Sequence, residues 1–336
     1  MKTVAIYYRT TADSYKADWC TSFEQGVNVH SNDWKAIPVR DTNIIDSDYA
    51  FVFNYQMFND ANKPNDTLRR RVIDKFEPSG KIFYTDGDVL ISYYDYSSDK
   101  NNIEETKNGK RYVRIPYGHV HPLKGGKWLM SPNPSIERWE KIKTDRNITV
   151  KDYDLKKGDY ILINLNRGTE GYSGEQVNAA DYAIETTNTL RQYTNRPIII
   201  RMHRAKGKWG VTDFDKLYAW STSGVVKDVI IQSKVLVKKH LVDEGYPPIL
   251  DAIRNSYAVV TFASSSACPA IIEGKPIFVT SPNCYFYDMS AGQLSDIEKP
   301  NINLDRDKWF LKYANTHFST HDLSSGYFWD IVKDMI

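Results

Sequence analysis

The stretch YAVVTFASSSACPAIIEGKPIFVT, residues 257–280, decides the fold class. Its opening, YAVVTF (257–262), is an apolar and β-branched run of strand length, and PIFVT (276–280) is a second one. The residues between them predict a short helix that ends at Gly274, because glycine is common just after a helix. A strand, a helix and a second strand form the unit from which parallel sheets are built. The stretch therefore predicts an α/β fold.

The same alternation continues through the rest of the chain. A further helix is predicted to begin at Pro247 and Pro248, since proline is tolerated in a first helical turn. The other predicted strands are residues 4–8, 49–55, 81–85, 160–165, 197–203 and 228–232, and the other predicted helices are residues 18–26, 66–76 and 176–193. We therefore expect two Rossmann-like domains that face each other across a cleft.

The domain boundaries follow from length and from a change of pattern. A chain of 336 residues corresponds to about two domains of roughly 150 residues. Between residues 93 and 139 the alternation gives way to Tyr, Asn, Gly, Lys and Pro, which puts the crossing between about 120 and 155. We predict a first domain over residues 1–140, a second over 155–310 and a helical tail over 311–336.

The composition is that of a soluble globular protein, with 41% hydrophobic and 26% charged residues. No apolar stretch reaches the roughly 18 to 20 residues of a membrane span, and MKTVAIYYRT (1–10) lacks the apolar region of a signal peptide. We therefore expect a cytoplasmic protein without a membrane partner. The 44 basic and 42 acidic residues give a net charge of +2, which does not demand a polyanionic partner.

Nothing in the sequence predicts a metal site. Cys20, Cys268 and Cys284 are far apart and are expected to be reduced thiols. His119 and His121 have no carboxylate close by in the sequence that would complete a set of metal ligands.

Three serines follow the predicted strand at 257–262, namely Ser264, Ser265 and Ser266. At a strand-to-helix junction, backbone N–H groups, hydroxyl donors and the positive end of the helix dipole would face a ligand, which suits a phosphate. Capping of the helix by one serine is the structural alternative. Glu273 ends the same helix, where it can accept hydrogen bonds from a ribose or remain an exposed charge.

The strand PIIIRMHR (197–204) carries Arg201, His203 and Arg204 to its carboxyl end, the edge at which open α/β sheets bind ligands. Forked arginine donors and a protonated histidine suit a diphosphate, while a purely structural histidine is the alternative.

In the first domain, the predicted strand 81–85 runs into Asp86, Gly87 and Asp88. A carboxylate at such a strand end can act as a general base toward an attacking hydroxyl. The alternative is a turn, because Asp-Gly is a common turn dipeptide.

Basic and aromatic side chains also gather in the first domain. They can hold a phosphate backbone and stack on an exposed base, or they can simply form a solvated helix face and a polar loop. The residues are Arg69, Arg70 and Arg71, then Lys110, Arg111 and Arg114 of KNGKRYVR (107–114), and Tyr93, Tyr94 and Tyr96.

From the loop after Leu165 to its end, the chain resembles bacterial and phage glycosyltransferases of the GT-B type, which have two Rossmann-like domains and include capsular polysaccharide, sialic acid and Kdo transferases. Two departures from the family pattern are Arg204 in place of a common proline, and His317-Phe318 in place of Gln-Trp. The matching pieces are NRPIIIRMHR (195–204), the serine junction with IIEGKPIFV (271–279), and DRDKWFLKYANTHFSTHDLSSGYFW (305–329).

This resemblance implies a metal-independent glycosyltransferase that moves a sugar from a nucleotide sugar, which we expect to be UDP-linked, to a hydroxyl by inverting single displacement. The nucleotide sugar is a substrate, and no cofactor is implied. Asp86 would be the catalytic base and Glu273 would bind the donor ribose. By the same resemblance, the donor phosphates would be held by His203, Ser264, Ser265 and Ser266. Because of their position at the end of the strand, Arg201 and Arg204 are expected to bind the donor as well, and His203 is expected to act in catalysis by stabilising the departing phosphate charge.

The acceptor is a separate hypothesis. Phages modify hydroxymethylated bases in their DNA with sugar transferases, and this chain shows no membrane-attachment feature. We therefore expect 5-hydroxymethylcytosine in phage DNA as the acceptor, bound by the basic and aromatic residues of the first domain. The alternatives are a capsule or surface glycan acceptor, a non-catalytic nucleotide-sugar- or glycan-binding protein, and a nucleotide-sugar hydrolase or epimerase of the same architecture.

Overall fold

The computed structural model divides into two compact units. The first consists of Met1–Asn147 and Phe310–Ile336, and the second of Ile148–Trp309. The segment 311–336, which the sequence suggested as a separate tail, is thus part of the first unit. The structure describes residues 1–8, 15–30, 32–40, 43–53, 68–85, 90, 99–119, 127–166, 177–203, 208–233, 236–237, 240–241, 247–333 and 335–336.

A six-stranded sheet forms the first unit. Four parallel strands are followed by two short antiparallel ones at one edge. In spatial order the strands are β2 (Trp34–Val39), β1 (Lys2–Tyr7), β3 (Tyr49–Val52), β4 (Ile82–Tyr84), β6 (Pro116–Tyr117) and β7 (Lys127–Trp128).

Both faces of this sheet are covered, because the residues of each strand alternate between them. On β1, Val4 and Ile6 belong to a core that includes α1 (Tyr15–Val29). Ala5 belongs to a second core, which includes α2 (Leu68–Phe76). A strand that is covered on both faces is expected to have apolar residues at successive positions. This sequence pattern predicted β1 and β3.

The C-terminal segment completes the core on the α1 side. It contributes β15 (His317–Phe318), α10 (Thr320–Ser324) and α11 (Tyr327–Val332). Gly26, in α1, allows the close approach of α10, because a Cβ on this residue would lie 2.0 Å from the carbonyl oxygen of Leu323. The buried apolar residues of the segment in this core are Phe318, Leu323, Phe328, Trp329, Ile331 and Val332.

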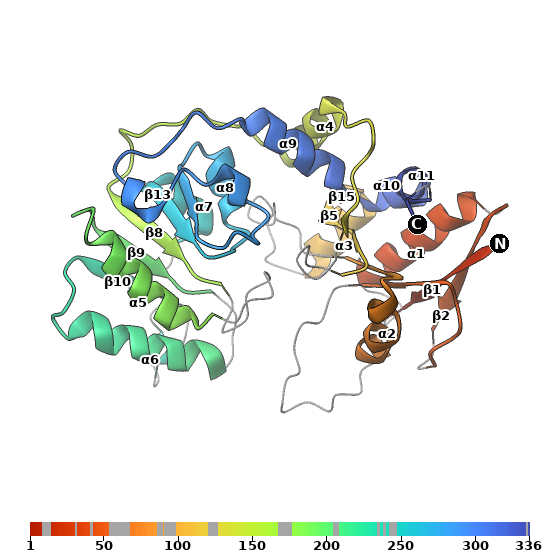
Figure 1. The fold of residues 1–336 in the computed structure, drawn as a ribbon, viewed down its shortest axis with the longest axis horizontal. Coiled ribbons are helices and arrows are strands. Elements are labelled where there is room, and N and C mark those ends of the chain that lie inside the picture. Colours follow the sequence, from red (N-terminus) through yellow and green to blue (C-terminus); the bar gives the residue numbers. More distant parts are fainter. Residues whose placement is uncertain are drawn as a thin grey trace. The chain divides into compact units, whose positions relative to one another are not determined.

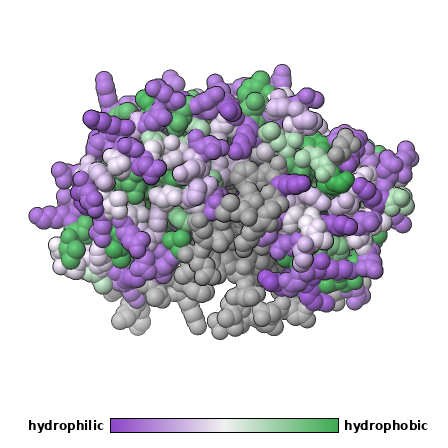
Figure 2. Space-filling view, in the orientation of Figure 1, coloured by the Kyte–Doolittle hydropathy of each residue, from purple (hydrophilic) through white to green (hydrophobic). Residues whose placement is uncertain are grey.

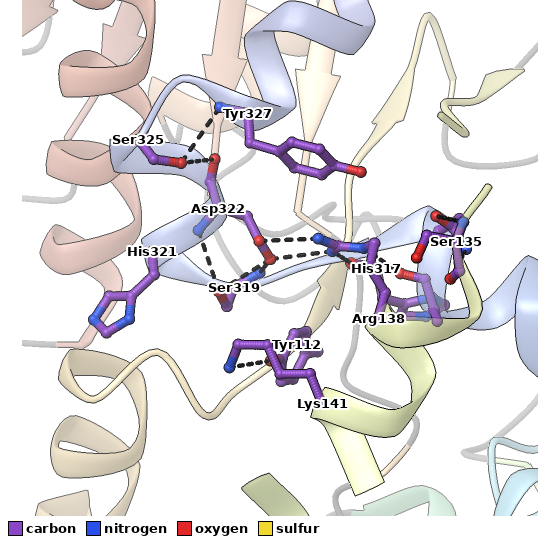
Figure 3. A network of polar contacts seen from close by, with 12 residues as sticks. Tyr112, Ser135, Arg138, Lys141, His317, Ser319, His321, Asp322, Ser325 and Tyr327 are labelled. Carbon is purple, nitrogen blue, oxygen red and sulfur yellow. Dashed lines mark hydrogen bonds and ion pairs between the residues drawn. The ribbon is translucent and has the colours of Figure 1, made fainter. Parts of the chain in front are cut away.

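Arg138, on α4 (Ile136–Arg146), ties this segment to the rest of the first unit (Figure 3). Its guanidinium donates to both carboxylate oxygens of Asp322, at 3.1 and 3.2 Å. It also donates to the carbonyl oxygen of His317 at 3.0 Å and lies 4.7 Å from the ring centroid of Tyr327. We call the two hydrogen bonds to Asp322 the fork. A lysine cannot reproduce them, because its side chain lacks the paired donors of a guanidinium.

His317 is fully buried, and its carbonyl oxygen accepts a hydrogen bond from Arg138. Burial and the charge of Arg114 lower the pKa of His317 to about 3. The ring is therefore neutral, and Nδ1 donates to the carbonyl oxygen of Tyr313 at 2.8 Å. The histidine acts here as an internal hydrogen-bonding residue.

Five parallel strands form the sheet of the second unit (Figure 1). When the five strands of this unit are numbered along the chain, their order across the sheet is 3-2-1-4-5. This is the strand order of a doubly wound Rossmann half. The order reverses between β8 and β13, and the carboxyl ends of these two strands form the topological switch point. The strands are β10 (Val229–Gln232), β9 (Ile198–Arg201), β8 (Tyr160–Asn164), β13 (Ser256–Thr261) and β14 (Ile277–Val279).

Helices cover both faces of the second sheet as well. Figure 1 shows α5 (Ala179–Leu190) and α6 (Lys208–Thr222) on one face, and α7 (Ile249–Arg254) and α8 (Ala267–Ile272) on the other. The core on the α5 and α6 side includes Ile161, Ile163, Ala180, Ala183, Ile200 and Leu217.

The structure confirms the predicted α/β fold class with mainly parallel sheets. Neither α4 nor the 15-residue α6 was predicted from the sequence, and β2 and several shorter elements were missed as well. α4 is largely charged, and its Trp139 stacks on Phe310 with ring centroids 4.4 Å apart. The remaining elements are α3 (Asp99–Lys107), α9 (Arg306–Thr316), β5 (Val113–Arg114), β11 (Leu236–Val237), β12 (His240–Leu241) and the 3-10 helices Glu77–Ser79, Tyr287–Met289 and Leu294–Asp296.

Candidate functional site

The carboxyl edge of the second sheet carries a row of polar side chains. Gln232, Arg201, Asn164 and Thr261 are neighbours in the register of β10, β9, β8 and β13. Residues in register on parallel strands face the same side of a sheet, so we call these four residues the polar row. Because the row crosses the switch point, it lies where open α/β sheets bind ligands.

The loop that follows β13 is held to this edge by three hydrogen bonds. The Thr261 hydroxyl donates to the carbonyl oxygen of Asn164 at 2.8 Å and accepts from the N–H of Ser264 at 3.1 Å. The N–H of Ala263 donates to Oδ1 of Asn166 at 3.2 Å. A loop fixed in this way has less conformational entropy to lose when a ligand binds.

The three serines in this loop have unequal environments. Ser264 Oγ accepts from the N–H of Ser266 at 3.3 Å and from its hydroxyl at 3.0 Å, whereas Ser265 is exposed. Ser264 thus stabilises the turn before α8, which is close to the capping role considered above. Because α8 has only six residues, a phosphate would depend on loop donors more than on a helix dipole. The phosphate role of these serines stays a prediction.

Arg201 is 6% exposed and is fixed by bonds to its neighbours. One guanidinium nitrogen donates to Oε1 of Gln232 at 3.2 Å, and the other donates to the carbonyl oxygen of Pro247 at 2.8 Å. His203 follows two residues later and is exposed at the same edge. The structure therefore brings Arg201 and the serine loop to one edge of one sheet, and their role in binding a diphosphate stays a prediction. Arg204 lies outside the described residues.

Glu273 is 5% exposed, which excludes the exposed charge considered from the sequence. One carboxylate oxygen accepts from Arg254 at 2.9 Å, and the other accepts from Lys151. At 1.5 Å per residue, Glu273 lies about 10 Å along the helix axis from the serine end of α8. The carboxylate anchors Lys151 of the segment before β8 to α8, and its contact with a donor ribose stays a prediction.

A prediction about stability follows from these ion pairs. Burial alone would raise the pKa of the Glu273 carboxyl, but bonds to and charges of Arg254 and Lys151 outweigh burial and hold the pKa below its ordinary value. A glutamate in an unfolded chain has a pKa of about 4.3. Because the folded value is the lower one, the stabilisation is present above about pH 4.3 and is lost as the pH falls through the folded pKa.

We expect Glu273→Gln to lower the free energy of unfolding of the second unit by about 1–3 kcal/mol at neutral pH. The difference should shrink in acid, because the wild-type carboxylate then becomes protonated. Urea unfolding at neutral pH and near pH 3 measures both values. A constant difference at the two pH values would contradict this role of the ion pairs.

The predicted acceptor-binding residues belong to the first unit. Arg69, Arg70 and Arg71 lie on α2, where Arg70 pairs with Asp74 at 2.9 Å. Lys110 and Arg111 precede β5, and Arg114 on β5 pairs with His317 of β15 in the sheet register. The candidates that lie outside the described residues are Asp86, Gly87, Asp88, Tyr93, Tyr94, Tyr96 and His121.

Neither a metal centre nor a membrane span is found in the described part of the chain. None of its groups of His, Cys, Asp and Glu side chains could hold a metal ion, and His119 lies 3.3 Å from the Glu77 carboxylate. None of its helices is long and apolar enough to cross a membrane. Figure 2 shows hydrophilic side chains over much of the described surface in that view, with apolar ones in smaller separate areas.

Asn164, Asn166 and Thr261 at this edge were not predicted as candidate site residues, although the sequence carries a signal for them. The segment ILINLN (161–166) puts two amides directly after an apolar strand, and Thr261 ends the strand across the switch point. Polar residues at those positions point to a ligand-binding edge once the strand order is known.

No protein-family model matches the chain, and no curated protein sequence matches it. Among solved structures, the chain is similar to KpsC of Thermosulfurimonas dismutans, a beta Kdo 2,4 transferase, with 10% identity over 94% of this chain and 90% of that chain and a TM-score of 0.44. The beta Kdo 2,7 transferase of the same organism matches with 10% identity over 100% of both chains and a TM-score of 0.45. S. aureus MnaA, solved with UDP, matches with 13% identity over 99% of this chain and 98% of that chain and a TM-score of 0.34.

Proposed function

We propose that the chain is a glycosyltransferase that transfers a sugar from a UDP-linked donor to a hydroxyl acceptor, and that the second unit binds the donor. The observation that carries this proposal is the carboxyl edge of the second sheet. There the loop after β13 is held in place by Thr261 and Asn166, beside the polar row that contains Arg201. Backbone donors, hydroxyls and an arginine at a switch point are the groups that a nucleoside diphosphate requires.

The proposed reaction is a single displacement with inversion at the anomeric carbon. The acceptor oxygen bonds to that carbon while the bond to the diphosphate oxygen breaks, and Asp86 takes the proton of the acceptor hydroxyl. Arg201, His203 and the serine loop stabilise the negative charge that develops on the departing nucleotide. The contact of Glu273 with the donor ribose requires this carboxylate to leave its ion pairs with Arg254 and Lys151. The nucleotide sugar is a substrate in this scheme.

The acceptor we propose is 5-hydroxymethylcytosine in duplex DNA. Support comes from the basic side chains of the first unit, on α2 and in the segment from Lys110 to Arg114, since such groups pair with backbone phosphates. DNA binding through them is expected to weaken steeply as salt is raised.

An acceptor screen tests the proposal. The protein is incubated with common UDP-sugars and either hydroxymethylated duplex DNA, unmodified DNA or an oligosaccharide. A mass increase of one sugar per modified base supports the DNA acceptor, and extension of the oligosaccharide instead supports a glycan acceptor. Sugar release or conversion without any acceptor identifies a hydrolase or an epimerase. Nucleotide binding without turnover identifies a binding protein.

The same assay tests the catalytic roles. We expect His203→Ala to lower kcat/KM roughly 10²-fold through loss of charge stabilisation at the leaving group. Asp86→Asn should bind donor normally but lose transfer, whereas the matched variant Asp88→Asn should remain active. Loss of transfer in Asp88→Asn alone would assign the base to Asp88.

A further inference from the structure

Asn164 stands out among the residues of the polar row because of its side-chain nitrogen. The residue ends β8 and is 3% exposed, and its Nδ2 is buried without a hydrogen-bond partner among the described residues. A buried amide nitrogen without an acceptor destabilises a protein, and buried polar groups in native structures nearly always have a partner. Such a group therefore needs an explanation, and a ligand at a functional site, an ion or a water molecule can supply the missing partner.

The position of Asn164 fits such a site. It is in register with Arg201 on β9 and with Thr261 on β13, so the three side chains face the same side of the sheet, with adjacent strands about 4.8 Å apart. The Thr261 hydroxyl is already engaged by the carbonyl oxygen of Asn164 and by the N–H of Ser264. It cannot easily turn to accept a hydrogen bond from the amide nitrogen of Asn164.

The chemistry of the row indicates which ligand group is missing. Asn164 Nδ2 is a donor only, and the neighbouring strand carries the guanidinium of Arg201, whose bonds to Gln232 and to the Pro247 carbonyl fix its charge at this edge. A donor next to a fixed positive charge favours an anionic oxygen acceptor. Phosphate oxygens are acceptors with negative charge at neutral pH.

We infer that Asn164 is a donor-binding residue whose Nδ2 donates a hydrogen bond to a phosphate oxygen of the nucleotide, beside Arg201. This inference rests on the proposed function and names a contact that the serine loop does not provide. The other source of an acceptor is a buried water molecule, which would make Asn164 a structural residue.

Two variants with opposite chemistry test the contact. Asn164→Leu keeps the size but removes the donor, and Asn164→Asp keeps the shape but replaces the donor by a carboxylate oxygen that repels phosphate. Calorimetry with UDP and with inorganic pyrophosphate measures affinity, and thermal unfolding without ligand measures stability. The charge-matched control is Asn255→Asp, an exposed residue after α7 at the opposite edge of the sheet.

We expect Asn164→Leu to weaken UDP and pyrophosphate binding by roughly 10- to 100-fold, the usual range for one lost hydrogen bond to a charged group. Asn164→Asp should weaken both further. The ligand-free Tm of Asn164→Leu should equal or exceed that of wild type, because the buried unsatisfied nitrogen is gone. Asn255→Asp should bind both ligands as wild type does. If Asn164 binds the ligand, Asn164→Leu lowers ligand affinity without lowering the Tm. If Asn164 is only structural, the variant does not lower the affinity in this selective way.

The outcomes distinguish the two proposals. If wild type binds UDP and both variants bind it equally well, the Asn164 contact is overturned while donor binding stands, and the nitrogen has a water as its partner. If UDP binding falls but pyrophosphate binding does not, the contact is with the nucleoside and the phosphate assignment is wrong. If wild type binds no nucleotide or nucleotide sugar, the proposed function and this inference both fail. Should Asn164→Asp not fold, Asn164→Leu decides alone.

Discussion

A chain that ends at Thr316 is expected to lose the fold of its first unit and to keep that of its second. The cut removes β15, α10 and α11, and with them six apolar side chains that are buried in the core of β1 and α1. Burial of one such side chain contributes about 1.5–3 kcal/mol. The loss of all six therefore matches or exceeds the total stability of a typical domain, which is about 5–15 kcal/mol. The second unit, Ile148–Trp309, loses none of its residues.

Hydrogen–deuterium exchange measures both units in one experiment. In the shortened chain, peptides that contain β1 and β3 should exchange rapidly, while those that contain β8 and β13 should remain protected. The control is a chain that ends at Lys333, which retains α11 and should show the wild-type pattern. Normal protection of β1 and β3 in the chain that ends at Thr316 would contradict the packing described here.

Replacement of Arg138 by methionine is expected to lower the free energy of unfolding of the first unit by about 3–5 kcal/mol. The substitution removes the fork to Asp322 and leaves that carboxylate, whose side chain is 17% exposed, without its cation. It also removes the hydrogen bond to the carbonyl oxygen of His317. Urea unfolding at neutral pH, followed by exchange of first-unit peptides, measures the loss.

A double variant separates the charge from the packing. Asp322 also accepts hydrogen bonds from the N–H and hydroxyl of Ser319, and an asparagine there keeps an acceptor for that cap. We therefore expect Arg138→Met with Asp322→Asn to be more stable than Arg138→Met alone, because no uncompensated charge remains. If the free energy of unfolding of Arg138→Met lies within about 1 kcal/mol of the wild-type value, the fork is not a main stabilising contact of this segment.

The strands of both sheets were predictable where the chain is apolar over several consecutive residues. Examples are β1, β8, β9 and β13, whose residues are buried on both faces of parallel sheets. β2 was missed because WKAIPV mixes Lys and Pro with apolar residues. The short helices of the C-terminal segment were predictable as helical, but not the unit in which they pack. Sequence periodicity identifies an apolar face and not its partner.

The sequence was enough to predict that the candidate site lies at the carboxyl edge of a sheet. It was not enough to predict the side-chain contacts within the site. Arg201 and the serines could be assigned to the carboxyl ends of strands, because strand ends are visible in the sequence. The pairing of Glu273 with Lys151 joins residues far apart in the chain, so no local pattern indicates it. Whether the Asn164 nitrogen has a partner among the described residues depends likewise on which strands are neighbours. Hydrogen-bond occupancy is a property of the assembled sheet.

The return of the C-terminal segment to the first unit has a consequence for synthesis on the ribosome. Domains usually fold in the order in which they emerge, at about 5–20 residues per second. Here β1 and α1 leave the ribosome early, but Phe318 and Trp329, which complete their core, follow only after the whole second unit. That delay is roughly 10 to 30 s at these rates. The unit translated second can thus fold first, while the nascent N-terminal half waits with exposed apolar surface that a chaperone can bind.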